Sequence, residues 1–252
     1  MIYVVMFIFG ALFGSFYLVI GTRLPLKENV ITGRSRCDNC KKTLKWYELI
    51  PIISFIFQKG KCNHCHKKIS IEHLIVEIIT GILFVVGYLI YGLTWDLGIY
   101  LILASLTILI FISDFKYMII LDSPLVISSI ILVFITYEKS GLKLTLYHLI
   151  YACLLFLTMC LIKIIGDRLF KKESLGGGDI KLSFVTGLVL GYQLGLISLI
   201  FASFLALPYA VLSLYLNKKN ELPFGPFLIS SALIIFIFIE KFTNLLIFFQ
   251  LS

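Results

Sequence analysis

The chain has 252 residues, of which 60% are hydrophobic and only 14% are charged, and its mean hydropathy is +1.01. Soluble domains carry about 25% charged residues, so this composition excludes an ordinary soluble domain and predicts an integral membrane protein. The formal net charge is +8, and the positions of the basic residues decide whether it indicates a nucleic-acid partner or a membrane topology.

Eight apolar segments are candidates for membrane crossing, since a helix needs about 20 mostly apolar residues to cross the hydrocarbon core. In chain order they are residues 2–21, 72–91, 97–113, 122–137, 145–165, 180–192, 194–216 and 227–249. The sixth segment is short and poorly separated from the seventh. The sequence therefore predicts an all-α, polytopic membrane protein of about eight transmembrane helices.

The basic residues indicate the topology. No basic stretch precedes the first segment and Arg23 follows it, which predicts an uncleaved helix with its N-terminus outside. Alternation then places four regions in the cytoplasm, residues 23–71, 114–118, 164–181 and 217–226. Every Lys and Arg lies in these regions or at their margins except Lys139, Lys143 and Lys241. This positive-inside pattern accounts for the net charge, so we expect the lipid bilayer as a partner and no nucleic acid.

One connection, residues 23–71, is long enough to hold a structure of its own. The predicted organisation is a first transmembrane helix at 1–22, a cytoplasmic loop at 23–71 and a multi-helix membrane domain at 72–252.

Two Cys-x-x-Cys pairs stand in this loop, Cys37–Cys40 and Cys62–Cys65. Four thiolates from two such pairs can surround a tetrahedral zinc, and a cytosolic loop disfavours disulfides. A thiol redox pair or unrelated free cysteines are the alternatives. We favour structural Zn²⁺ because a short polar loop gains folding free energy from the metal. Two neighbouring histidines could replace a thiolate, His64 and His66.

Two carboxylates lie at the ends of apolar segments, where charges are costly and indicate functional sites. Asp114 ends such a segment, where a negative charge opposes the helix dipole. Asp179 begins another, and helix capping alone could explain its position. Capping does not require the three glycines before it, residues 176–178, which permit positive φ and let another backbone come close. The topology places both aspartates at the cytoplasmic face.

Two carboxylates at one depth could share a proton, with one ionised to activate water and the other protonated to polarise a peptide carbonyl. The dipoles of their own helices favour Asp179 as the base and Asp114 as the acid. Asp122, in "LDSP", fits a helix N-cap and is interpreted as structural. Two alternatives stay open, a proton- or ion-coupled transporter using Asp114 and Asp179, and a non-catalytic zinc-loop scaffold.

Several motifs in one order resemble the type IV prepilin peptidases, which are membrane aspartic proteases with a Gly-x-Gly-Asp motif. "GGGD" at 176–179 matches that motif, and "SDFKYMIILD" at 113–122 is similar to the segment with the first catalytic aspartate, which falls on Asp114. Further matching motifs are "GSF" at 14–16, "RLP" at 23–25, "WYELIP" at 46–51, "VE" at 76–77 and "PFGPFL" at 223–228, together with the cysteine pairs.

This resemblance implies an aspartic endopeptidase with Asp114 and Asp179 as catalytic residues. Its substrates would be pilin-like, pseudopilin or competence precursors, from which it removes a short basic leader at the cytoplasmic face of the bacterial cytoplasmic membrane. The resemblance also implies N-methylation of the new N-terminus by S-adenosylmethionine, for which the sequence has no nucleotide-binding glycine fingerprint.

Overall fold

The computed structural model describes residues 1–30, 35–37, 39–216 and 222–251, with the backbone alone for residues 247–251. In these ranges the chain is helical, and its only β-pairing is two isolated bridges, Arg36 with Thr43 and Lys61 with Lys68. The all-α prediction is therefore confirmed. The chain divides into two compact units, residues 1–93 and 94–252.

The first unit pairs two apolar helices, α1 (Ile2–Arg23) and α3 (Ile71–Tyr91), and carries two short helices between them, η1 (Trp46–Leu49) and α2 (Ile53–Phe57). Small residues let α1 and α3 approach closely. A methyl group on Gly10 would lie 2.7 Å from the Thr80 carbonyl oxygen, and one on Gly14 would lie 2.8 Å from Thr80 Oγ1. This Gly-x-x-x-Gly spacing on α1 is a common packing device of membrane helices.

The structure places α3 with α1, whereas the division drawn from the sequence grouped residues 72–91 with the peptidase segment. The reason is the same close approach, because Gly81 of α3 leaves room for Phe7 of α1: a methyl group there would lie 2.7 Å from the Phe7 ring.

Where the structure describes it, the second unit contains five helices. They are α4 (Trp95–Tyr117), α5 (Asp122–Phe170), α6 (Gly177–Tyr215), α7 (Gly225–Ile237) and α8 (Ile239–Leu251). Helix α6 packs against both α5 and α7, and α4 packs against α7 and α5. The contacts bring the end of α4 and the starts of α5, α6 and α7 into one region.

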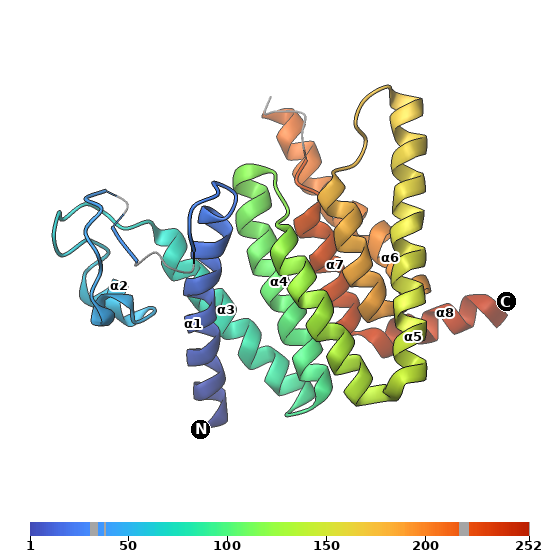
Figure 1. Ribbon diagram of the computed structural model, residues 1–252, viewed down its shortest axis with the longest axis horizontal. Helices are drawn as coiled ribbons and strands as arrows, with labels where there is room; N and C mark the ends of the chain where they lie inside the picture. The colour runs from blue at the N-terminus through green and yellow to red at the C-terminus, as the bar shows by residue number, and fades with distance from the viewer. Residues whose placement is uncertain (31–34, 38, 217–221, 252) are drawn as a thin grey trace. The chain divides into compact units, whose positions relative to one another are not determined.

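Two glycines reverse the long helices. Gly141 in α5 has φ 77° and ψ 172°, and Gly191 in α6 has φ 76° and ψ −179°, backbone conformations that only glycine adopts readily. Figure 1 shows α5 running down and then back up around this point. At 1.5 Å per residue, the 49 residues of α5 would measure about 74 Å and the 39 of α6 about 59 Å, roughly twice the hydrocarbon core.

The reversal at Gly141 falls between the fourth and fifth predicted segments, whereas the reversal at Gly191 falls inside the sixth, one residue before its predicted end. By length and hydropathy, five helices of the described part of the chain could cross a membrane, or six if α7 and α8 form one bent span. The prediction of about eight spans goes beyond this count and stays a prediction. Of the predicted cytoplasmic loop at 217–226, residues 217–221 lie outside the described residues.

The last predicted segment, residues 227–249, is not one continuous helix. The structure ends α7 at Ile237 and starts α8 at Ile239 with a bend of 86°. Phe238 at the break has φ −107° and ψ 29°, outside the helical range. The 13 residues of α7 rise only about 20 Å, less than the hydrocarbon core.

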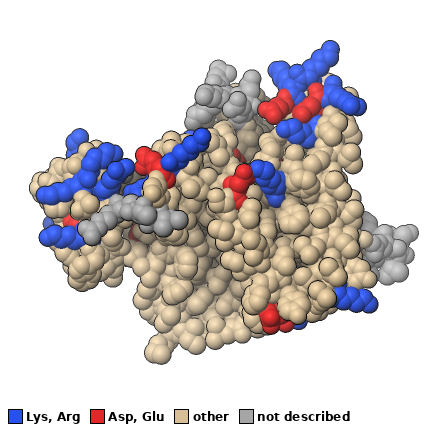
Figure 2. Space-filling view, viewed as in Figure 1, with Lys and Arg blue, Asp and Glu red and all other residues tan. Residues whose placement is uncertain are grey.

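Two ion pairs mark the two ends of the second unit. Lys139, near the reversal of α5, pairs with Asp96 in the first turn of α4. Lys181 Nζ lies 2.7 Å from Asp122 Oδ1, which joins the start of α6 to the start of α5. On the face shown in Figure 2, Lys and Arg gather over the loop of the first unit and over the end of α5, while the helix flanks carry few charges.

Candidate active site and metal centre

The two predicted catalytic aspartates lie at helix ends in the second unit. Asp114 is in the last turn of α4, and Asp179 is in the first turn of α6. Their exposed fractions are only 6% and 8%. Carboxylates are seldom this buried, which separates these two from ordinary surface aspartates.

The side chain of Ile120, between α4 and α5, fills the space where α6 and α7 begin. A methyl group on Gly178 would lie 2.7 Å from Ile120 Cβ, and a methyl group on Gly225 would lie 2.6 Å from Ile120 Cδ1. The same group on Gly225 would lie 3.1 Å from Asp114 Oδ2. Ile120 therefore contacts Gly178, the residue before Asp179, on one side. On the other side it contacts Gly225, which lies next to Asp114.

This packing brings the two carboxylates within electrostatic range of each other. The backbone N–H of Gly225 donates a hydrogen bond to Asp114, and that of Gly176 donates to Asp179. Asp179 also donates its backbone N–H to the Gly176 carbonyl at 3.2 Å. Gly176 is the N-cap residue of α6, and no side-chain cap is present at that helix end, so capping does not explain Asp179.

One oxygen of this pair has no protein partner. Asp179 Oδ1 is buried and, within the described ranges, accepts no hydrogen bond from the protein. The hydroxyl of Ser113, beside Asp114 and 1% exposed, is in the same condition. Buried polar atoms without partners are costly and call for a water or substrate group as their partner.

The three glycines before Asp179 serve different purposes from those predicted. None of them has a positive φ, so the expected backbone freedom is not used here. Gly178 makes room for Ile120, and a methyl group on Gly176 would lie 3.1 Å from Asp179 Oδ2. Only around Gly177 would an added methyl group meet nothing within 4 Å. Clearance for a substrate backbone therefore applies to Gly177 alone.

Two helix ends act on Asp114, and the prediction that it is the acid considered only one of them. Asp114 does lie at the C-terminal end of α4, which favours its protonated form. It also accepts the N–H of Gly225, the first residue of α7, and a helix N-terminus favours a negative charge. The dipoles of the two helix ends have opposite effects on the protonation of Asp114, so they do not by themselves select it as the acid.

The structure keeps Asp122 apart from this pair. Its side chain is exposed and bonded to Lys181, at 2.7 and 2.8 Å for its two oxygens. Asp122 begins α5, but no side-chain cap is present at that helix end. Its role is therefore an ion pair, and the predicted N-cap is wrong.

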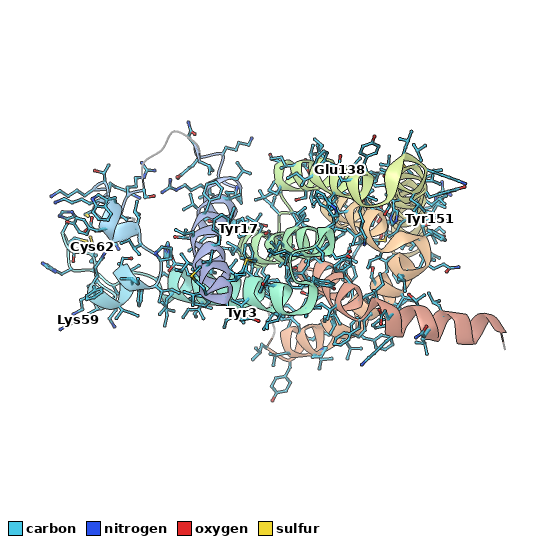
Figure 3. All side chains as sticks on the ribbon, turned by 90° about the horizontal axis from the view of Figure 1, so that it is seen from below. Tyr3, Tyr17, Lys59, Cys62, Glu138 and Tyr151 are labelled. Carbon is cyan, nitrogen blue, oxygen red and sulfur yellow. The ribbon has the colours of Figure 1, made fainter. Side chains whose placement is uncertain are left out.

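The four loop cysteines come together in the first unit. Their Sγ atoms all lie within 4.8 Å of one another, and the Sγ atoms of Cys37 and Cys65 are 3.9 Å apart. Tetrahedral zinc with Zn–S bonds of about 2.3 Å requires sulfurs about 3.8 Å apart, so the cluster fits such an ion. Within the described residues the cluster consists of these four cysteines and does not include His64 or His66. Figure 3 shows Cys62 in the loop.

The two cysteine pairs have the same backbone design. In the first, Lys41 donates its N–H to the Cys37 carbonyl at 2.8 Å, and in the second, His66 donates to the Cys62 carbonyl at 2.9 Å. Lys41 and His66 also share a left-handed conformation, with φ of 58° and 55°. A repeated turn that aims two thiols at one point is typical of metal knuckles.

Backbone N–H groups also prepare one thiol for metal binding. The N–H groups of Cys65 and His64 point at the sulfur of Cys62 and lower the pKa of its thiol to about 7. The thiolate is the metal-binding form, so the loop favours the required charge state at this position. Asn63, which lies between Cys62 and His64, donates a side-chain hydrogen bond of 2.9 Å to the buried Glu48.

Sequence reasoning missed two residues of the aspartate site, Ile120 and Gly225. Gly225 lies in "PFGPFL", which indicated a family resemblance and no role. Its signal was a Gly-Pro step at the start of an apolar segment, where the glycine N–H is free of intrahelical bonds. Ile120 carries no sequence signal, because only the packing of distant glycines against it reveals its function.

Comparison with known proteins assigns both units. Residues 8–91 match the model of the Bacterial Peptidase A24 N-terminal domain, and residues 101–211 match that of the Type IV leader peptidase family. A Prepilin leader peptidase/N-methyltransferase of Bacillus subtilis is 33% identical over 93% of this chain and 93% of its own length. One of Vibrio cholerae is 32% identical over 93% of this chain and 96% of its own length.

No solved structure matches the chain. The matched residues cover most of both units, and the order of the motifs agrees with the two family models. The chain therefore belongs to the type IV leader peptidase family.

Proposed function

We propose that this protein is a prepilin leader peptidase that uses Asp114 and Asp179 as an aspartic catalytic pair. The main support for this proposal is the pair of buried carboxylates at two neighbouring helix ends, one oxygen of which has no hydrogen-bond partner among the described residues. The names of the relatives support the substrate class, prepilin-like precursors. Family membership gives no support to the transporter alternative.

The mechanism needs one ionised and one protonated carboxyl. The ionised group takes a proton from a water molecule, whose oxygen adds to the scissile carbonyl carbon. The protonated group donates to the carbonyl oxygen, and the tetrahedral intermediate then breaks its C–N bond as the amine receives a proton. The unpartnered Oδ1 of Asp179 is the atom best placed to hold the water, because no protein donor competes for it.

The site lies at a helix end, which suits a substrate that is itself a membrane helix with a leader. By the positive-inside rule, the ends of α4 and α6 that carry the pair face the cytoplasm, and the N-terminus of the chain lies outside. A precursor of type IV pilin, pseudopilin or competence protein would insert with its basic leader on that side of the bacterial cytoplasmic membrane. The scissile bond would then meet the pair at the membrane edge.

The cysteine cluster extends the proposal to a structural Zn²⁺ held by Cys37, Cys40, Cys62 and Cys65. The sulfur spacing and the paired turns support it. Bound zinc would hold the two knuckles together and stabilise a loop with little apolar core. The relatives' names also include N-methyltransferase, which supports methylation of the new N-terminus with S-adenosylmethionine as the methyl donor.

Replacement of either aspartate tests the catalytic pair. Asp114→Asn or Asp179→Asn should lower leader removal about 10²–10⁴-fold, because each removes one of the two proton-transfer groups. Precursor and protein are reconstituted together, and the cleaved product is followed by gel shift and mass. Asp122→Asn is the matched control, since loss of an exposed ion pair is worth at most about 1 kcal/mol. Cleavage that survives in either site variant contradicts the aspartic mechanism.

The adjacent glycines provide a second test. Gly178→Ala should lower the melting temperature, because overpacking against Ile120 costs about 1–3 kcal/mol. Gly177→Ala should leave the melting temperature unchanged or higher and raise KM for the precursor, because its methyl group enters open space reserved for substrate. Thermal unfolding and cleavage kinetics on the two variants separate these effects. Wild-type KM in Gly177→Ala would rule out substrate at that position.

Metal analysis tests the cysteine cluster. The purified protein should contain about one zinc per chain by elemental mass spectrometry. Cys62→Ser should lose most of it, because a buried ligand is removed, whereas Cys153→Ser, an exposed position on α5, should retain it. Zinc absent from the wild type, or retained in full by Cys62→Ser, would favour the thiol redox alternative.

A further inference from the structure

The segment between the two cysteine pairs has an apolar surface that the peptidase mechanism does not use. It comprises η1, α2 and the connection between them, residues 46–57. Four of its large side chains are more than half exposed: Trp46 at 78%, Phe57 at 83%, Ile56 at 61% and Ile53 at 52%. So many exposed apolar side chains on twelve residues mark an interaction surface and not a solvated loop.

The segment is fixed at its centre to a membrane helix. Ile52 donates its backbone N–H to Glu77 Oε2 of α3 at 2.7 Å. Glu77 is buried, with an exposed fraction of 6%. Ile52 has φ 62°, a conformation that costs a β-branched residue about 1–3 kcal/mol. A strained residue held by a buried carboxylate indicates that the position of this segment is determined by α3.

The attachment point sets the depth of the segment in the membrane. Helix α3 begins at Ile71, so Glu77 lies six residues, or about 9 Å, along it. The apolar stretch that crosses the bilayer begins at about Leu74, after Glu72 and His73. Glu77 is thus within about one helical turn of the hydrocarbon boundary, and Ile52 is held at the same level.

The charges around the segment agree with that depth. Three lysines flank the apolar residues and are exposed: Lys45, Lys59 and Lys61. The ammonium group of Lys45 lies 5.7 Å from the ring centre of Tyr47. Trp and Tyr favour the membrane–water interface, and nearby lysines attract anionic lipid headgroups.

We propose that residues 46–57 insert into the interfacial region of the bilayer, on the side where α1 ends and α3 begins, and that Glu77 fixes their depth. The occupant of the apolar surface is the lipid boundary between headgroups and acyl chains. The segment also holds the metal loop at the membrane, because Glu48 in η1 bonds Asn63 of the second cysteine pair at 2.9 Å. This inference does not depend on the peptidase chemistry.

Fluorescence of Trp46 tests the insertion. The chain has two tryptophans, so Trp95→Phe leaves Trp46 as the only reporter. The full-length variant is placed in nanodiscs of phosphatidylcholine and phosphatidylglycerol, with and without bromine on the acyl chains. We expect brominated lipid to quench Trp46 and aqueous iodide to quench it weakly. Trp46→Phe, which leaves Trp95 at the start of α4, provides the reference for an interfacial tryptophan.

Two results would overturn the insertion. Strong iodide quenching without lipid quenching would place Trp46 in water. Protection from both quenchers would mean that protein covers the segment, either another part of this chain or a second copy.

Variants at Glu77 test the clamp in the same Trp95→Phe background. Glu77→Gln keeps an oxygen that can accept the Ile52 N–H, whereas Glu77→Leu has similar size and none. We expect lipid quenching of Trp46 to be retained in Glu77→Gln and lost in Glu77→Leu, for protein that elutes as a single species. Equal quenching in the two variants would refute the role of Glu77 in setting the depth. If Glu77→Leu does not yield folded protein, Glu77→Ala removes the same acceptor with a smaller side chain, and it should lose the lipid quenching as well.

Discussion

The candidate active site depends on one packing constraint, the close approach of two glycines to the side chain of Ile120. Gly178 at the start of α6 and Gly225 at the start of α7 leave no room for a Cβ on that side. Their contact with Ile120 draws the starts of α6 and α7 to the end of α4. Asp114 and Asp179 sit next to these contacts, so the distance between the two carboxylates is fixed by apolar packing and not by a bond between them. This separation of roles leaves the charged groups free for chemistry.

Two helix ends stabilise the buried carboxylates. Asp179 accepts the N–H at the start of its own helix, and Asp114 accepts the N–H that begins α7. Backbone donors supply part of the stabilisation that water would give to a negative charge. The arrangement is incomplete at Asp179 Oδ1, which has no protein donor. A buried carboxylate with one unpartnered oxygen lowers the stability of the fold. Such a loss is expected at a site where a water or substrate must bind.

Much of this architecture could be predicted from the sequence, and the limits have physical reasons. Apolar length predicts the helices, and charges at their ends single out Asp114 and Asp179. The reversal at Gly191 was expected only as a poorly defined boundary, because one glycine in an apolar segment does not by itself break a helix. The bend at Phe238 and the clamp between Ile52 and Glu77 were not predicted. Both arise from tertiary contacts or backbone strain, for which local residue preferences carry no signal.

Both aspartates should act on one reacting carbon, and binding of a mimic of the tetrahedral intermediate provides the sharpest test. A peptide spanning a prepilin leader junction, with a hydroxyethylene group in place of the scissile amide, presents a hydroxyl where both carboxyls should meet the tetrahedral intermediate. We expect wild-type protein to bind this peptide at least about 10²-fold more tightly than Asp114→Asn or Asp179→Asn does, with each variant losing a similar factor. Undiminished binding by either variant would contradict it, because that carboxyl would then not touch the reacting group.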